Sequence, residues 1–180
     1  MTLPFLTISL RRAAASLIAA TAVALTCTPA AAVTSEPWTG VVTFVVDGDT
    51  LRIRPLAGGK PFKVRLSGID APEICQPGGL ASRDALSGRL MGRAVRVNVK
   101  TRDAYSRLVA GVALDGQDVA QWMVLQGQAW SAGYRQSAGP YGAQQAQAQA
   151  ARRGLFAPGA SGHTPVRPAE FRKSRKSCYG

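Results

Sequence analysis

Histidine, cysteine and acidic side chains are all scarce in this sequence. The only histidine, His163, lies in a segment rich in glycine and proline, and none of the three cysteines has a partner at metal-ligand spacing. This scarcity argues against zinc sites and against histidine-dependent nucleophiles. Ten Asp and Glu stand against 22 Lys and Arg, for a net charge of +12. Such an excess favours a polyanionic partner, nucleic acid first and an anionic membrane or cell wall second; the alternative is solubility alone.

Long hydrophobic runs are absent after residue 32. Before that point, Arg11 and Arg12 precede an acid-free apolar run over residues 13–25, and the alanines at 30–32 offer a cleavage site. Residues 1–32 are therefore interpreted as a signal peptide, with a twin-arginine signal as the alternative, because the apolar run is short for a membrane span. We expect a periplasmic or secreted monomer that does not insert into a membrane once the signal is removed.

The expected mature chain, residues 33–180, has 148 residues, which suits one domain with a full hydrophobic core. We divide it into a domain over residues 33–160 and a basic tail over residues 161–180. Its 20 basic and 10 acidic side chains leave a net charge of +10. Cys75 and Cys178 remain, and in an oxidising compartment they most simply form one disulfide. Free thiols or a bond between two chains are the alternatives.

Apolar alternation predicts five short strands, over residues 41–46, 51–54, 62–66, 95–99 and 108–114. Helices are expected over residues 80–91, 119–126 and 140–153, and a loop over residues 67–79. This order predicts an α+β fold built on a five-stranded OB-type Greek-key β-barrel with about three helices. The alternative is an open antiparallel sheet with helices on one face.

The stretch VVDGDTLRIR, residues 45–54, places two aspartates inside a strand-like run. Asp47 and Gly48 predict a tight turn, because glycine readily adopts the left-handed backbone that such turns need. A turn does not explain Asp49, since strand alternation resumes at Thr50. Asp49 is therefore a candidate functional residue.

Further charged residues flank the third and fifth expected strands. Asp70 and Glu73 lie in the segment GIDAPE, Arg65 lies on the polar face of the third strand, and Arg107 precedes the fifth. Alone, each is an ordinary turn residue or surface charge. Together, close carboxylates favour a hard divalent cation, and arginines stabilise charge on a phosphorus centre. A further carboxylate can orient or deprotonate water, so this set predicts phosphodiester hydrolysis.

Four segments, in this order, carry a family resemblance: DGDT at 47–50, VRLSGIDAPE at 64–73, DAYSR at 103–107 and ARRGLF at 151–156. Together they resemble the staphylococcal-nuclease-like (thermonuclease) family over about residues 41–156. The resemblance implies an OB barrel with three helices. It also implies calcium-dependent cleavage of DNA and RNA that leaves 3′-phosphate ends.

The resemblance further implies a metal site. Asp49 and Asp70 match the family's calcium-binding aspartates, and Ala71 matches a position that gives its backbone carbonyl to the metal. The best-studied family pattern has threonine where Ala71 stands, so a hydroxyl contact is lost while the carbonyl remains. Asp47 is interpreted as a turn residue or as support for the metal ligands.

Catalytic and substrate-binding roles follow from the same resemblance. Glu73 matches the glutamate that acts as general base or orients water, and Arg65 and Arg107 match the arginines that hold the phosphate and its transition state. Ala104 replaces a lysine that binds a terminal phosphate of the ligand. Tyr134 is a candidate for contacting a base or phosphate.

Three functions account for some or all of these features. A secreted calcium-dependent nuclease of low sequence specificity accounts for the motifs, the charge and the signal peptide. A non-catalytic OB-fold module that binds single-stranded nucleic acid is the alternative, although all five charged catalytic matches are present. A basic protein adhering to a wall or membrane accounts for charge and export but for none of the motifs.

Overall fold

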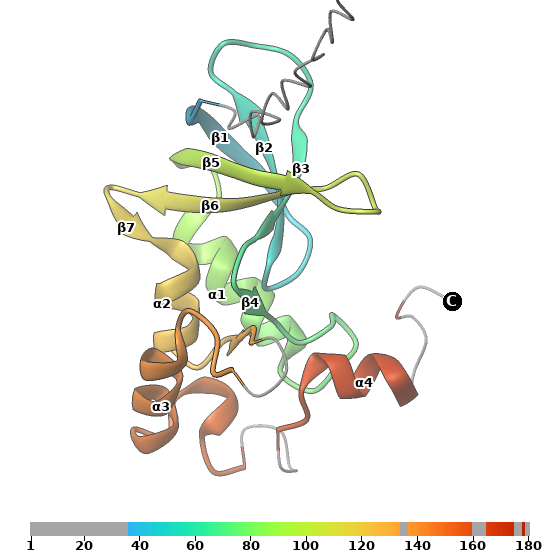
Figure 1. Ribbon diagram of the computed structural model, residues 1–180, viewed down its shortest axis with the longest axis vertical. Helices are drawn as coiled ribbons and strands as arrows, with labels where there is room; N and C mark the ends of the chain where they lie inside the picture. The colour runs from blue at the N-terminus through green and yellow to red at the C-terminus, as the bar shows by residue number, and fades with distance from the viewer. Residues whose placement is uncertain (1–35, 134–136, 160–164, 175–177, 179–180) are drawn as a thin grey trace, which may run out of the picture. The chain divides into compact units, whose positions relative to one another are not determined.

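Five strands close into a barrel in the computed structural model (Figure 1), which describes residues 36–133, 137–159, 165–174 and 178. The strands are β1 (Trp38–Val45), β2 (Thr50–Pro55), β3 (Phe62–Leu66), β5 (Ala94–Arg102) and β6 (Leu108–Leu114). They are hydrogen-bonded in the order β3-β2-β1-β5-β6, and the parallel pairing of β3 with β6 closes the circle. The closed OB-type α+β barrel is confirmed, and the alternative open sheet is wrong.

The barrel interior is filled by alternate side chains of its strands. Leu51 and Ile53 of β2, and Val64 and Leu66 of β3, are completely buried. Between them Arg52 points to solvent, because successive side chains of a strand face opposite sides of the sheet. Each such aliphatic side chain contributes about 1.5–3 kcal/mol when fully buried. The barrel is therefore the rigid part from which charged side chains at the strand ends project.

Four helices and a short 3-10 helix complete the described chain. They are α1 (Gly79–Leu90), α2 (Val119–Leu125), α3 (Gly142–Ala150), η1 (Gly154–Phe156) and α4 (Pro168–Ser174). Helix α1 buries Leu86 and Leu90, four residues apart, against the core. Helix α2 begins where the Asp118 carboxylate accepts the N–H groups of Ala120 and Gln121. No helix within the described residues has the length and apolar character needed to cross a membrane.

Three short strands add detail that the sequence pattern does not predict. They are β4 (Ile69–Asp70), β7 (Gln117–Asp118) and β8 (Trp130–Ser131). Strand β4 pairs with β8, so that Asp70 lies opposite Trp130. The expectation that residues 67–79 form only a loop is wrong at this point, because a two-residue strand is too short to show alternation. The pairing fixes the backbone of Asp70.

Candidate active site

Asp49 lies at the entrance to β2, where its carboxylate is almost entirely buried. Asp49 Oδ1 accepts the Thr50 hydroxyl at 2.9 Å, and Oδ2 accepts the N–H of Ala71 at 3.1 Å. Asp47 Oδ1 accepts the N–H of Asp49 at 3.0 Å, which confirms the turn role expected for Asp47. Asp49 thus joins the β1–β2 turn to the chain that follows β4.

Position 48 requires glycine because there is no room for a side chain, and not because the backbone there is left-handed. Its φ is not positive, so the expectation of a left-handed glycine turn is wrong. A Cβ atom at Gly48 would lie 1.9 Å from Ser82 Oγ on α1 and 2.7 Å from the Cβ of Ala71. The turn is therefore pressed against helix α1 and against Ala71, a contact between distant segments that local turn statistics do not contain.

The acidic side chains are crowded and partly removed from water. Burial, followed by the neighbouring charge of Asp49, raises the pKa of Asp47 to about 7. Burial also raises the pKa of Asp70, although hydrogen bonds and charge from Arg172 act in the opposite direction. This cluster favours nearby cations, which relieve the repulsion among its carboxylates.

Arg65 lies between two of the acids. It projects from β3, and its Nη2 atom is 3.2 Å from Asp49 Oδ2 and 3.1 Å from Asp70 Oδ1. Its backbone lies opposite Thr50 in the β2–β3 ladder, which places the guanidinium beside the β2 entrance. The structure thus brings together one arginine and two aspartates that the sequence singled out.

Arg107 is held at the entrance to β6 by Asp103. Asp103 Oδ2 accepts Arg107 Nε at 2.7 Å, and Oδ1 accepts the backbone N–H of Arg107 at 2.9 Å. The N–H of Tyr105 also donates to Asp103 Oδ1, so one carboxylate shapes the whole DAYSR turn. Asp103 is a positioning residue that sequence reasoning missed, although its place in the DAYSR motif was a signal.

Glu73 lies in a tight loop between β4 and α1. Its backbone N–H donates to the side chain of Gln76 at 3.2 Å, and its carbonyl accepts the N–H of Gln76 at 2.8 Å. A Cβ atom at Gly79 would lie 1.9 Å from the Glu73 carbonyl oxygen, so the first turn of α1 packs directly on this loop. The side chain of Glu73 therefore projects from a constrained backbone.

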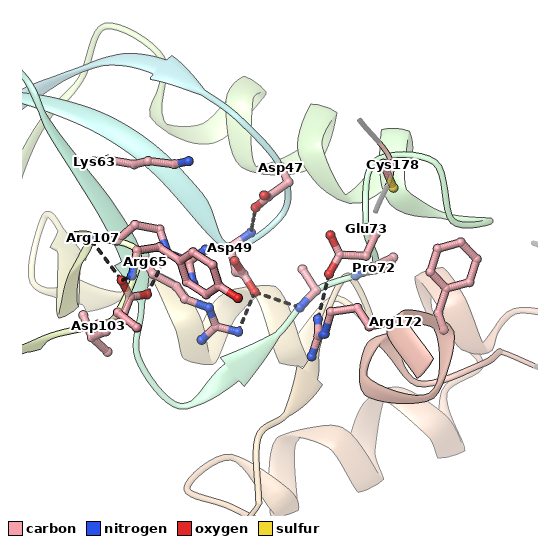
Figure 2. Close-up of a pocket in the computed structure, with 15 residues that line it drawn as sticks. Asp47, Asp49, Lys63, Arg65, Pro72, Glu73, Asp103, Arg107, Arg172 and Cys178 are labelled. Atoms are coloured by element: carbon pink, nitrogen blue, oxygen red, sulfur yellow. Dashed lines mark hydrogen bonds and ion pairs between the residues drawn. The ribbon is translucent and has the colours of Figure 1, made fainter. Parts of the chain in front are cut away.

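A cavity of about 740 Å³ contains these groups. Five of the six residues assigned metal or catalytic roles line it, from strand β3, the entrances to β2 and β6, and the loop after β4: Asp49, Arg65, Ala71, Glu73 and Arg107. In Figure 2, Asp49 faces Arg65 on the barrel side of the cavity, and Glu73 faces Arg172 on the side of the loop and α4. The sixth residue, Asp70, adjoins the cavity through the guanidinium groups of Arg65 and Arg172.

Other cavity residues differ in how far the sequence predicts them. Ala104 lines the cavity at the position where the family pattern has lysine. Lys63 also lines it and was given no role from the sequence, whereas Arg172 comes from the basic tail, whose charges were expected only to add to non-specific polyanion binding. Tyr134 lies outside the described residues, so its predicted contact stays a prediction. Arg172 had no signal of its own except its place six residues before Cys178.

Cys75 and Cys178 form a disulfide in the structure. The sulfur atoms are 2.06 Å apart and the Cα atoms 5.6 Å apart, across a sequence separation of 103 residues. Cys75 lies two residues after Glu73, and Cys178 also lines the cavity. The bond therefore joins the end of the basic tail to the loop that carries Glu73.

The oxygen ligands fit a hard cation, though the set is small. No group of three or more His, Cys, Asp or Glu within the described ranges is arranged to hold a metal ion. The ligands implied by the resemblance are the carboxylates of Asp49 and Asp70 and the carbonyl of Ala71. Among the described residues, Asp49 Oδ1 and Asp70 Oδ2 each accept one hydrogen bond, from Thr50 and Arg172 respectively, and so retain a lone pair. Calcium takes such oxygen ligands and completes its shell with water.

Comparison with known proteins gives one family. The family described as "Staphylococcal nuclease homologue" matches residues 63–158 of this chain. This span includes Asp70, Glu73 and the DAYSR turn but begins after the DGDT segment at 47–50. The match therefore covers more than half of the sequence.

Individual relatives carry nuclease names. A Haemophilus influenzae protein named "Uncharacterized endonuclease" is 39% identical over 137 residues, which cover 75% of this chain and 73% of the relative. A probable staphylococcal-like nuclease of Oryza sativa subsp. japonica is 32% identical over 118 residues, but the chain covers only 34% of its length. A protein of Escherichia coli O157:H7, also named "Uncharacterized endonuclease", is 40% identical over 92 residues, which cover 51% of this chain and 59% of the relative. With its OB-type barrel and its nuclease-named relatives, this chain belongs to the staphylococcal nuclease family.

Proposed function

We propose that the protein is an exported, calcium-dependent nuclease that hydrolyses DNA and RNA with low sequence specificity and leaves 3′-phosphate ends. One observation carries the proposal: Asp49, Glu73, Arg65 and Arg107 converge on a single cavity, with Asp70 beside them. The net charge of +10 on the expected mature chain supports a polyanionic substrate. The signal-like segment over residues 1–32 supports export to the periplasm or beyond.

Each charged group has a role in this reaction. Water attacks phosphorus while the bond to the 5′-oxygen breaks, and that oxygen leaves as a hydroxyl with a proton from solvent. Glu73 takes the proton of the attacking water, since its carboxylate lies at the cavity surface with 31% of its side chain exposed. Arg65 and Arg107 donate hydrogen bonds to the non-bridging phosphate oxygens, where negative charge grows in the transition state. Asp103 holds Arg107 in place through two hydrogen bonds. A calcium ion bound near Asp49 and Asp70 would polarise the phosphate as a Lewis acid.

A digestion assay tests this proposal. Plasmid, single-stranded DNA and RNA are incubated with the protein in calcium or in EDTA, and product ends are mapped with a 3′-phosphatase. We expect degradation in calcium alone. Glu73→Gln should lower the rate about a hundredfold or more, whereas Glu36→Gln, which makes the same charge change at an exposed residue outside the cavity lining, should not.

The results separate the proposal from its alternative. Full activity in EDTA would contradict metal dependence, and equal activity of wild type and Glu73→Gln would contradict the role of Glu73. Binding to single-stranded nucleic acid without cleavage under any metal condition would support the non-catalytic OB-fold module instead.

A further inference from the structure

Helix α4 places a guanidinium on the acids that the proposed reaction needs. Arg172 Nη1 is 2.7 Å from Glu73 Oε1 and 3.2 Å from Asp70 Oδ1, and Nη2 is 3.0 Å from Asp70 Oδ2. One side chain thus engages both oxygens of Asp70 and one oxygen of Glu73. Figure 2 shows Arg172 reaching Glu73 from the helix side of the cavity.

A hydrogen bond and a disulfide attach the chain on either side of α4 to the loop that carries Glu73. Gln76 Nε2 donates to the carbonyl of Val166, before α4, at 2.7 Å. The Cys75–Cys178 disulfide attaches the chain after α4. We call Val166 and Cys178, with α4 between them, the α4 arm. Both of its anchors are neighbours in the loop, so the arm and the loop form one unit.

The guanidinium of Arg172, held in this way, competes with a metal cation for the carboxylate oxygens of Asp70. Asp70 Oδ1 already accepts Arg65 and Arg172, so it has no lone pair left for a metal, and Asp70 Oδ2, which accepts Arg172 alone, offers its one remaining lone pair beside a guanidinium charge. A tethered group acts at a high effective concentration, about millimolar for short flexible links. The affinity of any ligand for a protein falls in proportion to the fraction of molecules whose site is free. The α4 arm must therefore weaken cation binding at Asp70 for as long as Arg172 remains there.

We propose that the α4 arm is an internal competitor of the metal, in which Arg172 occupies Asp70 and Glu73 until a divalent cation displaces it. The disulfide sets the strength of this competition, so the oxidised protein requires more calcium than the reduced protein. The inference rests on the metal dependence proposed above. It adds a regulatory role for a segment that lies beyond the family match at residues 63–158.

Calorimetric titration of calcium into the metal-free, oxidised full chain tests the role of Arg172. If Arg172 occupies its acids about nine-tenths of the time, Arg172→Gln should bind calcium about tenfold more tightly than wild type. Lys173→Gln is the matched control, because it removes the same charge from the same helix at an exposed residue with no ion pair among the described residues. Its calcium affinity should equal that of wild type.

A second variant removes the Cys75–Cys178 disulfide without altering Arg172. Cys75→Ser/Cys178→Ser should bind calcium several-fold more tightly than the oxidised wild type and less tightly than Arg172→Gln. Equal affinity of wild type and Arg172→Gln would overturn the competition alone, and equal affinity of wild type and the cysteine variant would overturn the role of the disulfide. Calcium binding by none of the proteins would overturn the proposed metal dependence and this inference with it.

Discussion

The two halves of the candidate active site are held in different ways. The barrel half consists of Asp49, Arg65 and Arg107, whose side chains are 8%, 22% and 20% exposed and project from the ends of barrel strands. The loop half consists of Glu73 and Arg172, which are 31% and 44% exposed. The barrel half is placed by a hydrophobic core, whereas the loop half is placed by hydrogen bonds and one disulfide.

This difference determines how each half responds to change. A cooperative barrel moves or unfolds as a whole, so its charged side chains keep their mutual geometry as long as the core persists. The loop half contributes few buried apolar contacts and can open locally. Catalytic geometry should therefore be stable on the barrel side and adjustable on the α4 side.

The largest expected effect is catalytic and concerns the barrel half. Arg107→Ala should lower kcat/KM about 100- to 1,000-fold, because it removes one donor to the transition-state charge. Its effect on the free energy of unfolding should stay below about 1 kcal/mol, since the pair with Asp103 is partly exposed. Arg96→Ala, an exposed arginine on β5, is the control. Comparable rate losses in both variants would contradict a specific role for Arg107.

A core substitution tests whether the barrel half depends on packing. Leu66→Ala should lower the free energy of unfolding by about 2–5 kcal/mol, because Leu66 is completely buried beside Arg65. Leu80→Ala, at a side chain that is 55% exposed, should change it by about 0.5 kcal/mol or less. Urea unfolding followed by circular dichroism measures both. Similar urea midpoints for the two variants would show that the stability of the barrel does not depend on packing at Leu66.

Removing the disulfide should loosen the loop half and spare the barrel. Loop-closure entropy predicts that a disulfide closing about 100 residues stabilises the folded state by about 4.7 kcal/mol. The tail, however, packs little against the barrel, so its attachment should affect the stability of the barrel less. We expect Cys75→Ser/Cys178→Ser to lower global stability by much less. Hydrogen-exchange mass spectrometry should show faster exchange in residues 73–79 and 168–174, with β2 and β3 unchanged. Uniformly faster exchange would show instead that the two halves are one cooperative unit.

The smallest effect concerns charges of the tail outside the cavity. Arg167→Gln/Lys173→Gln should reduce the slope of log K against log salt for non-specific DNA binding by at most about 2, because each phosphate contact releases counterion. Fluorescence anisotropy at several salt concentrations measures the slope, with a catalytically impaired background such as Glu73→Gln. Arg83→Gln is a control, since Arg83 is already paired with Asp84. An unchanged slope in the tail variant would mean that these charges do not reach the nucleic acid.

The barrel was predictable because strand alternation is a local property. Leu51, Ile53, Val64 and Leu66 alternate with polar residues in the sequence, and all four fill the core. Asp49, Arg65 and Arg107 lie at the ends of such strands, so placing the strands also placed these side chains.

Other features could not be read from local pattern. The space that requires Gly48 is defined by Ser82 of α1 and by Ala71, and the position of Asp70 depends on pairing with Trp130. Helix α4 has seven residues, too few for a helix that is stable by itself. Its sequence showed only a basic tail.

The amino-acid pattern alone was enough to predict the barrel, the acids and arginines available for chemistry, and two cysteines suited to a disulfide. The contact of Arg172 with Asp70 and Glu73 arises only in the folded chain. That contact joins residues about 100 positions apart, and it depends on chain closure through Gln76 and Cys75. The local periodicity of the sequence carries no information about this long-range contact. The free energy of closing the chain depends on several distant groups that meet at once.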